Sequence, residues 1–400
     1  MEFKESWMSG IPFSLDPIHL CEPSDKKIYY HYTSMEKLWK ILEGEQLRAT
    51  QACFSNDSEE ISMGIKVIKK VCKELFLGKD TEMMTFIENL SRDDLDSYII
   101  CFCDKDDKLS QWRAYCKKGG ASIGFAFDDS LPSYYFSKME GYRRVEKNCQ
   151  LYPVFYYNYD SVCKKCSKCL THRKLKKIIK NKMKIIGDNQ AKKMAILEII
   201  PYIKHCGFCE EEEHRLLIEN PLDYSMRNTA FVSDEIVEYF ENDGKKSPHI
   251  NISFSNNINS SDRNICIFCE EVQFDDILDK ISKEIEKYNI TVPDDKKIVL
   301  DNIKHVTSKE KKILIGQCEE SVQKQLFGII DRINSPLDID NSSEIIPIWC
   351  DGHLPIRTIT VAPSLDQERQ ISMIKHFCTH NQFWMKYVKV VGSKIPYRYY

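Results

Sequence analysis

The stretch LSQWRAYCKKGGASIGFAFD, residues 109–128, carries the clearest local signal in the chain. Trp112 and Tyr115 are three residues apart, so a helix would place both side chains on one side, with Arg113 beside them. The pair Gly119–Gly120 then permits a tight turn. The run SIGFAF follows the turn and predicts a strand. A helix that turns directly into a strand indicates a fold with mixed α and β structure.

Strand-like runs rich in β-branched and aromatic residues recur along the chain. They lie at residues 28–33, 47–50, 98–103, 122–127, 151–157, 215–219, 356–361 and 387–392. Helical patterns separate them irregularly, not in a regular β–α–β alternation. The pattern predicts an α+β fold class with a core of two small packed sheets.

Two stretches lack strand signal, and we predict both as mostly helical insertions in the core. The first is rich in lysine and cysteine, and the second is charged with polar spacers. The predicted division is an N-terminal arm (1–26), a first core segment (27–157), the basic insertion (158–203), a second core segment (204–256), the second insertion (257–343) and a third core segment (344–400).

The composition is that of an ordinary globular protein. Of the 400 residues, 42% are hydrophobic and 29% are charged, which excludes disordered and collagen-like chains. The net charge of -3 excludes a polycation, so any affinity for nucleic acid requires a local patch. No apolar run reaches the roughly 18 residues of a membrane span. The 17 cysteines accompany no export signal, which favours reduced thiols and a cytoplasmic protein without membrane contact.

A local basic patch does occur within the first predicted insertion. Residues 164–184 hold ten lysine and arginine side chains and no acidic one. A cationic helix of this kind can bind phosphate groups, and Lys176, Lys177 and Lys180 are the candidate contacts. The alternative interpretation is a solvated helix face.

The same region contains a metal-like spacing of cysteines and histidine. Cys163, Cys166, Cys169 and His172 are each three residues apart, and Cys-x-x-Cys is a common zinc-ligand spacing. Each three-residue step on a regular helix drifts by about 60°, so all four cannot reach one ion on an unbroken helix. We therefore favour a face of small apolar thiols and expect no zinc.

An acidic cluster precedes another predicted strand, in the run CEEEEHRLLIEN at residues 209–220. On a strand, Glu211 and Glu213 share one face, with Arg215 below them. Two carboxylates on one face repel, which raises the pKa of one unless a cation compensates. Beside His31 at a sheet edge the cluster would form a reaction centre. The alternatives are a solvent-facing cluster or a structural network of ion pairs.

Trp112 and Arg113 also leave two interpretations open. Trp112 is either core or part of a ligand site. Arg113 either caps the end of its helix or forks onto a phosphate or carboxylate.

Taken together and in order, these segments resemble a bacterial family known as domain of unknown function 2971. The segments that carry the resemblance are YYHYTSMEKLWKIL, LRAT, FSNDSEE, CFCDKDDKLSQWRAYCKKGGASIGFAF, KHCGFCEEEEHRLL, LPIRTITVAPSLDQE and VVGSKIPYR. They cover about 28–128, 150–157, 204–220 and 350–398. Since the family carries no activity in its name, function must be argued from the site.

The layout is also similar to ADP-ribosyltransferase-like folds, and this similarity implies a split-sheet core and a function. It implies that Glu213 holds the ribose 2′-hydroxyl of NAD and that Glu211 positions the acceptor. The implied cofactor-binding residues are His31, Tyr32, Ser55, Trp112, Arg113, Tyr115 and Arg215, with His31 also counted as catalytic.

The implied function is that of an NAD-consuming transferase or glycohydrolase, acting on a protein or nucleic-acid target. The family resemblance further suggests a bacterial stress or phage-defence effector. Two alternatives stay open: a non-enzymatic module that binds a ligand or partner, and a nucleic-acid effector that uses the basic helix.

Overall fold

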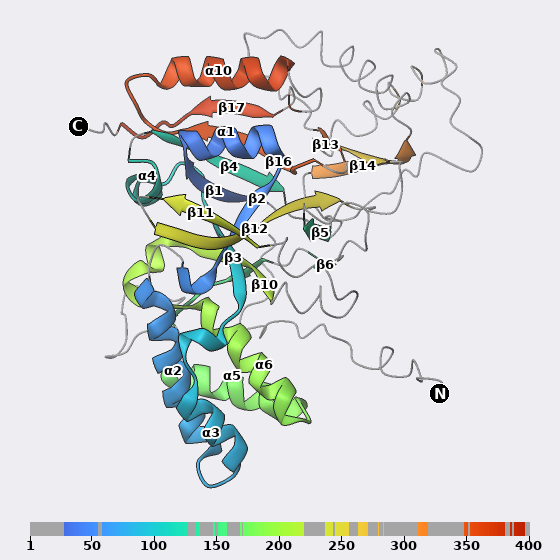
Figure 1. Cartoon of the computed structure of the whole chain (residues 1–400). Helices are drawn as coiled ribbons and strands as arrows, with labels where there is room; N and C mark the ends of the chain where they lie inside the picture. The colour runs from blue at the N-terminus through green and yellow to red at the C-terminus, as the bar shows by residue number, and fades with distance from the viewer. Residues whose placement is uncertain are drawn as a thin grey trace.

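Figure 1 shows the computed structural model of the chain. It describes residues 28–54, 58–117, 119–126, 133–136, 147–148, 151–157, 169, 171–219, 237–242, 245–255, 263–270, 279, 283, 310–318, 348–350, 353–380, 385 and 388–396. The predicted N-terminal arm lies outside these residues.

One twelve-stranded sheet organises the described structure, in the order β17-β16-β4-β1-β3-β2-β12-β5-β6, with β10 paired to β3 and β7, and β11 paired to β12. The parallel pair is β16 with β17, and the other pairs of this sheet are antiparallel. Its strands are β1 (Ile28–Ser34), β2 (Leu47–Gln51), β3 (Ser97–Cys103), β4 (Gly120–Ala126), β5 (Ser133–Phe136), β6 (Lys147–Asn148), β7 (Leu151–Pro153), β10 (Glu213–Glu219), β11 (Glu238–Asn242), β12 (Lys245–Ser255), β16 (Ile356–Val361) and β17 (Lys389–Gly392).

The α+β class is consistent with this architecture, but the expected core of two small packed sheets is wrong. Strand β10 pairs with β3 along its whole length, from Glu213 opposite Cys103 to Glu219 opposite Ser97. This pairing joins the first and second predicted core segments in one layer. The strand expected at 151–157 is also divided. Its second half, β8 (Phe155–Tyr157), leaves the large sheet after Pro153 and pairs in parallel with β9 (Ile203–His205).

The large sheet forks at β3. Strand β1 pairs with β3 near one end, at Tyr30 opposite Cys103. Strand β2 pairs near the other end, at Thr50 opposite Ile99. Within the described ladders, neither strand pairs with the residues of β3 between these two points. The gap between β1 and β2 is therefore a place where side chains can meet in the middle of the sheet.

A helical arm extends from one end of the sheet, as Figure 1 shows. It consists of α2 (Ser58–Phe76), α3 (Thr81–Asn89), α5 (His172–Ile185) and α6 (Asn189–Ile199). Its core is built from aliphatic side chains of all four helices, and Ile68, Ile179 and Ile196 are fully buried in it. The helical prediction for 158–203 is thus confirmed for residues 172–185 and 189–199. In the described portion of the chain, no helix combines the length and apolar character needed to cross a membrane.

Three further helices pack elsewhere on the sheet. Helix α1 (Met35–Gly44) links β1 to β2, and α10 (Gln367–His380) packs against β16 and β17. Helix α4 (Leu109–Tyr115) lies against β1 and is followed by the predicted tight turn. Gly119 has a φ of 91° there, and a Cβ on Gly120 would lie 2.2 Å from the carbonyl oxygen of Thr33. Both positions therefore require glycine.

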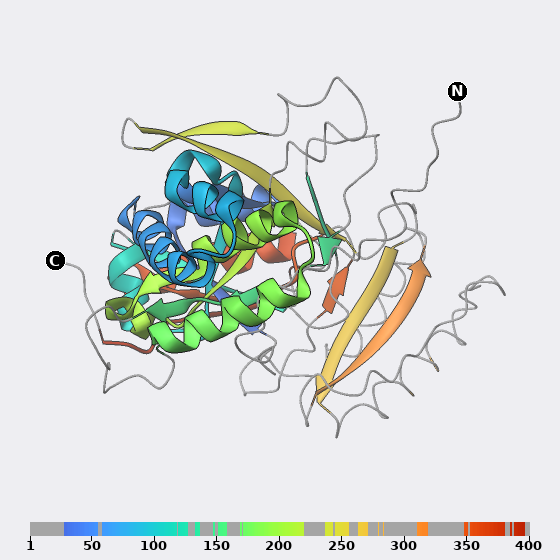
Figure 2. The same cartoon turned by 90° about the horizontal axis from the view of Figure 1, so that it is seen from below.

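The prediction that 257–343 is mostly helical is wrong for most of its described residues. Strands β13 (Arg263–Glu270) and β14 (Glu310–Cys318) pair with each other, and β13 also pairs with β15 (Ile348–Cys350). They form a separate three-stranded sheet, seen beside the main body in Figure 2. Strand pairing between distant segments prevailed over the charged composition that had suggested helices.

Candidate functional site

A cavity of about 490 Å³ opens at the fork between β1 and β2. We call it the fork cavity. Its size falls within the range of small-molecule sites, roughly 300–1,000 Å³. Strands β1, β2, β3, β10 and β12 and helix α1 contribute to its wall, together with Glu60, Tyr115, Lys204, Phe208 and Glu211. The side chains used below are His31, Lys37, Lys40, Arg48, Phe54, Glu60, Cys101, Tyr115, Lys204, Phe208, Glu211, Glu213 and Arg215.

His31 occupies the gap in the ladder. Its Nδ1 lies 2.9 Å from the backbone oxygen of Cys101 on β3. A carbonyl oxygen only accepts, so Nδ1 carries the proton and donates. Burial lowers the pKa of His31, which keeps the ring neutral near pH 7. The second nitrogen, Nε2, is then an acceptor. The imidazole thus takes the place of a missing strand partner and can also accept a hydrogen bond.

One end of the cavity holds five charged side chains, which we call the buried ion network: Glu60, Lys204, Glu211, Glu213 and Arg215. The Lys204 ammonium lies 2.7 Å from Glu211 and 2.7 Å from Glu213. The Arg215 guanidinium donates from Nε to Glu213 at 2.6 Å and also contacts Glu60 and the backbone oxygen of Pro201. Arg215 is only 2% exposed.

Glu211 and Glu213 both contact Lys204, although they lie in different elements of secondary structure. Glu213 begins β10, whereas Glu211 ends the 3-10 helix η4 (Cys206–Glu211). Between them Glu212 adopts a left-handed conformation, with φ of 48°. The predicted proximity of Glu211, Glu213 and Arg215 therefore holds. It arises from a turn at Glu212 and not from the regular alternation of one strand.

Glu213 and Glu211 differ in their acid–base properties. Burial raises the pKa of a carboxyl group, but the charges of Arg215 and Lys204 outweigh this and hold the pKa of Glu213 below its usual value of 4.5. For Glu211, burial dominates the opposing effect of Lys204, and the pKa is raised. Glu213 is thus a permanent carboxylate with a cation on each oxygen. Glu211 is the group in this pair whose protonation changes more readily.

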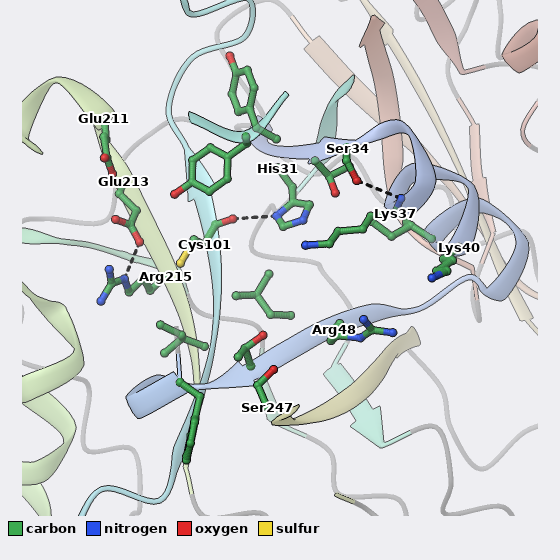
Figure 3. A pocket seen from close by; sticks show the side chains of 18 of the residues that line it. His31, Ser34, Lys37, Lys40, Arg48, Cys101, Glu211, Glu213, Arg215 and Ser247 are labelled. Atoms are coloured by element: carbon green, nitrogen blue, oxygen red, sulfur yellow. Dashed lines mark hydrogen bonds and ion pairs between the residues drawn. The ribbon is translucent and has the colours of Figure 1, made fainter. Parts of the chain in front are cut away.

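The opposite end of the cavity is cationic. Lys37 and Lys40 come from α1, and Arg48 comes from β2. Lys40 also pairs with Glu36 at 2.7 Å. Figure 3 shows these three side chains on one side of His31, with Glu211, Glu213 and Arg215 on the other. The cavity therefore has a basic end and an end that contains three carboxylates.

Aromatic rings accompany the carboxylates. Tyr115 and Phe208 line the cavity there, and the Lys204 ammonium lies 5.2 Å from the centre of the Phe208 ring. Both rings are partly accessible, with Tyr115 36% and Phe208 41% exposed. Phe54 is another exposed ring in the cavity wall. Flat surfaces beside hydrogen-bonding groups are typical of sites for heterocyclic ligands.

The structure brings together most of the residues proposed from the sequence. His31, Tyr115, Glu211, Glu213 and Arg215 line the cavity. Ser55 lies outside the described residues, although its neighbour Phe54 lines the wall.

Trp112 and Arg113 are not among the cavity-lining residues. Trp112 is fully buried, and its ring nitrogen donates to Asp107 at 2.9 Å. Tyr32 lines the cavity, but its ring packs against Trp112 with centroids 4.7 Å apart. The Tyr32 hydroxyl donates to the backbone oxygen of Lys105 and accepts from the backbone nitrogen of Lys108. Arg113 is exposed on α4. The placement of Trp112 agrees with a role in the core.

Sequence reasoning missed the remaining charged residues of the cavity, namely Lys37, Lys40, Arg48, Glu60 and Lys204. The first three flank predicted apolar positions of a helix and a strand, and each is an ordinary surface residue by pattern. Glu60 is 155 residues from its partner Arg215, so only the fold brings the two together. Of these residues, Lys204 was the one that a sequence motif could have indicated. It lies seven residues before Glu211, within the segment KHCGFCEEEEHRLL.

The cysteine–histidine spacing falls largely outside the described structure. Cys163 and Cys166 are outside it, and Cys169 is half-buried. His172 engages the Tyr157 hydroxyl through Nδ1 at 3.0 Å and Glu74 through Nε2 at 3.1 Å. The described residues contain no group of three or more histidine, cysteine or acidic side chains placed to hold a metal ion.

Residues 111–216 match the family described as "Protein of unknown function (DUF2971)". The matched segment runs from α4 to β10 and includes Tyr115, Lys204, Glu211, Glu213 and Arg215. The DUF2971 segment thus supplies much of the acidic end of the cavity, whereas His31 and the basic end precede it. No curated protein and no solved structure matches the chain.

Proposed function

We propose that the fork cavity binds NAD and cleaves the bond between nicotinamide and ribose. In this reaction a water molecule or an acceptor hydroxyl attacks the ribose carbon, and nicotinamide leaves with the bonding electrons. The proton of the attacking group passes to solvent. The products are nicotinamide and either free ADP-ribose or an ADP-ribosylated acceptor. The similarity to ADP-ribosyltransferase-like folds suggested this chemistry.

The observation that carries the proposal is the polarity of the cavity. NAD has a cationic nicotinamide ring at one end and a pyrophosphate near its middle. Tyr115, Phe208 and Glu211 offer flat surfaces and negative charge to the nicotinamide riboside. Lys37, Lys40 and Arg48 offer positive charge to the phosphates. A single orientation of the dinucleotide satisfies both ends.

Glu211 is the carboxylate best placed to act in this reaction. Both oxygens of Glu213 already have cationic partners, on Arg215 and Lys204. Glu211 contacts Lys204 through one oxygen, and its side chain is 16% exposed. In the proposal, Glu211 holds the ribose hydroxyl and stabilises the positive charge that develops on the sugar. Glu213 is a positioning residue that fixes Lys204 and thereby Glu211.

The test is nicotinamide release from NAD by wild-type protein and by Glu211→Gln. Removing a group that stabilises charge in the transition state typically lowers the rate by about 10²–10³-fold, and we expect a loss of that size. Glu210→Gln is the matched control, because Glu210 is an adjacent exposed glutamate outside the cavity wall. Equal rates for Glu211→Gln and wild type would contradict the role of Glu211. Absence of release by wild type would contradict the proposed activity.

A second variant tests the basic end separately. Arg48→Gln weakens the site for the phosphates, so KM for NAD is expected to rise about tenfold or more while kcat changes little. A fall in kcat with unchanged KM would place the phosphates elsewhere.

Because Arg215 and Lys204 already pair with both oxygens of Glu213, a second candidate function is a module that binds a nucleotide without reacting with it. Binding of NAD measured by calorimetry, together with absence of nicotinamide release, is the outcome expected for that module. A role in stress response or phage defence stays a prediction from the family resemblance.

A further inference from the structure

Helix α5 carries a row of cations on the outside of the helical arm, away from the fork cavity. Arg173, Lys177, Lys180 and Lys184 follow one another at steps of four, three and four residues, and all four are exposed. At 100° per residue they fall within an arc of about 60°. We call these four residues the cation row. Figure 2 shows α5 in green at the edge of the arm.

The cation row faces solvent because the opposite face of α5 packs against the helical arm. Leu175, Ile179 and Met183 are buried in the core of the arm. Lys176, one of the lysines expected to bind phosphate, points elsewhere and pairs with Glu74 on α2 at 2.6 Å. Of the three lysines expected to bind phosphate, Lys176 is thus neutralised by an ion pair, whereas Lys177 and Lys180 face solvent.

No carboxylate competes with a ligand for the row within the described residues. Helix α5 contains no acidic residue, and none of the ion pairs in the described structure involves a residue of the row. The chain as a whole has a net charge of -3, so the positive potential here is local.

We infer that the cation row binds the phosphate backbone of a nucleic-acid duplex. From Arg173 to Lys184 the helix rises about 16 Å, the length over which one strand of a duplex presents about five phosphates. The row has no aromatic residue on which unpaired bases could stack, which favours a duplex over a single strand and predicts no sequence preference. The inference is independent of the proposed activity of the fork cavity.

A membrane surface fits the row less well. Helices that lie on membranes insert an apolar face between lipids. The apolar residues of α5 are buried or partly buried in the arm, apart from Ile185 in the last turn. The helix therefore offers charge without an apolar face to insert.

The experiment measures binding of the full chain to a fluorescent DNA duplex and an RNA duplex of about 20 base pairs by anisotropy. With four phosphate contacts, log K is expected to fall against log salt with a slope of about −3.6, so that the affinity falls about 150-fold between 50 and 200 mM salt. In the triple variant Lys177→Gln, Lys180→Gln, Lys184→Gln, the slope is expected to fall to about −0.9.

The control is Lys375→Gln, Lys389→Gln, Lys394→Gln, which removes the same charge from exposed lysines near α10 and β17, at the other end of the molecule in Figure 1. It is expected to bind like wild type. Thermal unfolding of both triple variants verifies that they are folded. The inference is overturned if wild type shows no salt-dependent binding, if the two triple variants bind equally, or if anionic vesicles are bound and duplexes are not.

Discussion

Two sets of ion pairs in this protein use the same chemical groups in opposite surroundings. In the buried ion network, Lys204, Glu213 and Arg215 are each at most 6% exposed in their side chains. On the helical arm, Glu74 contacts His172 and Lys176, and the Glu74 side chain is 40% exposed. Water can replace a lost partner more easily on the exposed arm than in the buried network. The comparison shows that a charge cluster recognised in a sequence does not by itself indicate its contribution to folding stability. That contribution depends on how deeply the charged groups are buried.

The largest effect is expected from Arg215→Met. Loss of the guanidinium breaks the ion pairs of Arg215 with Glu60 and Glu213 and leaves Lys204 as the cation that still contacts both carboxylates. Breaking a buried ion pair by removing one partner typically costs about 3–5 kcal/mol. Chemical denaturation of the variant measures this as a lower free energy of unfolding. Arg215→Lys, which keeps the charge, is expected to recover some of the loss. A destabilisation below about 1 kcal/mol would show that the network behaves like the surface pairs.

Acidification is expected to have an intermediate effect on folding stability. Its sign differs between Glu213 and Glu211. The pKa of Glu213 is lowered in the folded protein, so its stabilisation is present above pH 4.5 and is lost as the pH falls below that value. The pKa of Glu211 is raised, so its ionisation works against folding as the pH rises above 4.5. Each unit of pKa difference corresponds to about 1.4 kcal/mol.

The two glutamine variants separate these contributions. The loss of stability between pH 7 and pH 3 is expected to be smaller in Glu213→Gln than in wild type, and larger in Glu211→Gln. Equilibrium unfolding at each pH measures the free energy of unfolding of the three proteins. Identical pH dependence in the three proteins would contradict the assignment of opposite shifts.

The smallest effect is expected from Glu74→Gln on the helical arm. Exposed ion pairs contribute about 0–1 kcal/mol, so the variant should lose less than about 1 kcal/mol of unfolding free energy, and salt should reduce the loss further. A loss similar to that of Arg215→Met would remove the contrast between the two regions.

Strands with dense aromatic and β-branched residues were predictable from sequence, whereas their partners were not. The runs that became β1, β3, β4 and β16 were recognised because their composition suits a buried pleated surface. Strand β12 was missed, although Ile250 and Ile252 alternate with His249 and Asn251, because its start, KKSP, is typical of a turn. The single large sheet was missed because strand order depends on pairing between distant segments.

The site was predictable only where its chemistry is local in sequence. Glu211, Glu213 and Arg215 lie within five residues, and their spacing alone predicted that they would meet. His31 was placed beside them through the resemblance to known folds. Arg48 and Glu60 had no local signal, because a polar residue beside an apolar one is ordinary on the surface of a helix or strand. Their involvement follows from the fork in the sheet.

The fork has a practical consequence for dissecting this molecule. Strands β1 and β2, which flank the gap, and strand β3, which they share, are all encoded before residue 111, where the DUF2971 match begins. A fragment cut to the boundaries of that match would keep Lys204, Glu211, Glu213 and Arg215 but lose Glu60, His31 and every cation of the basic end. Such a fragment would expose charges that the intact protein shields, and it would present half a binding site to solvent.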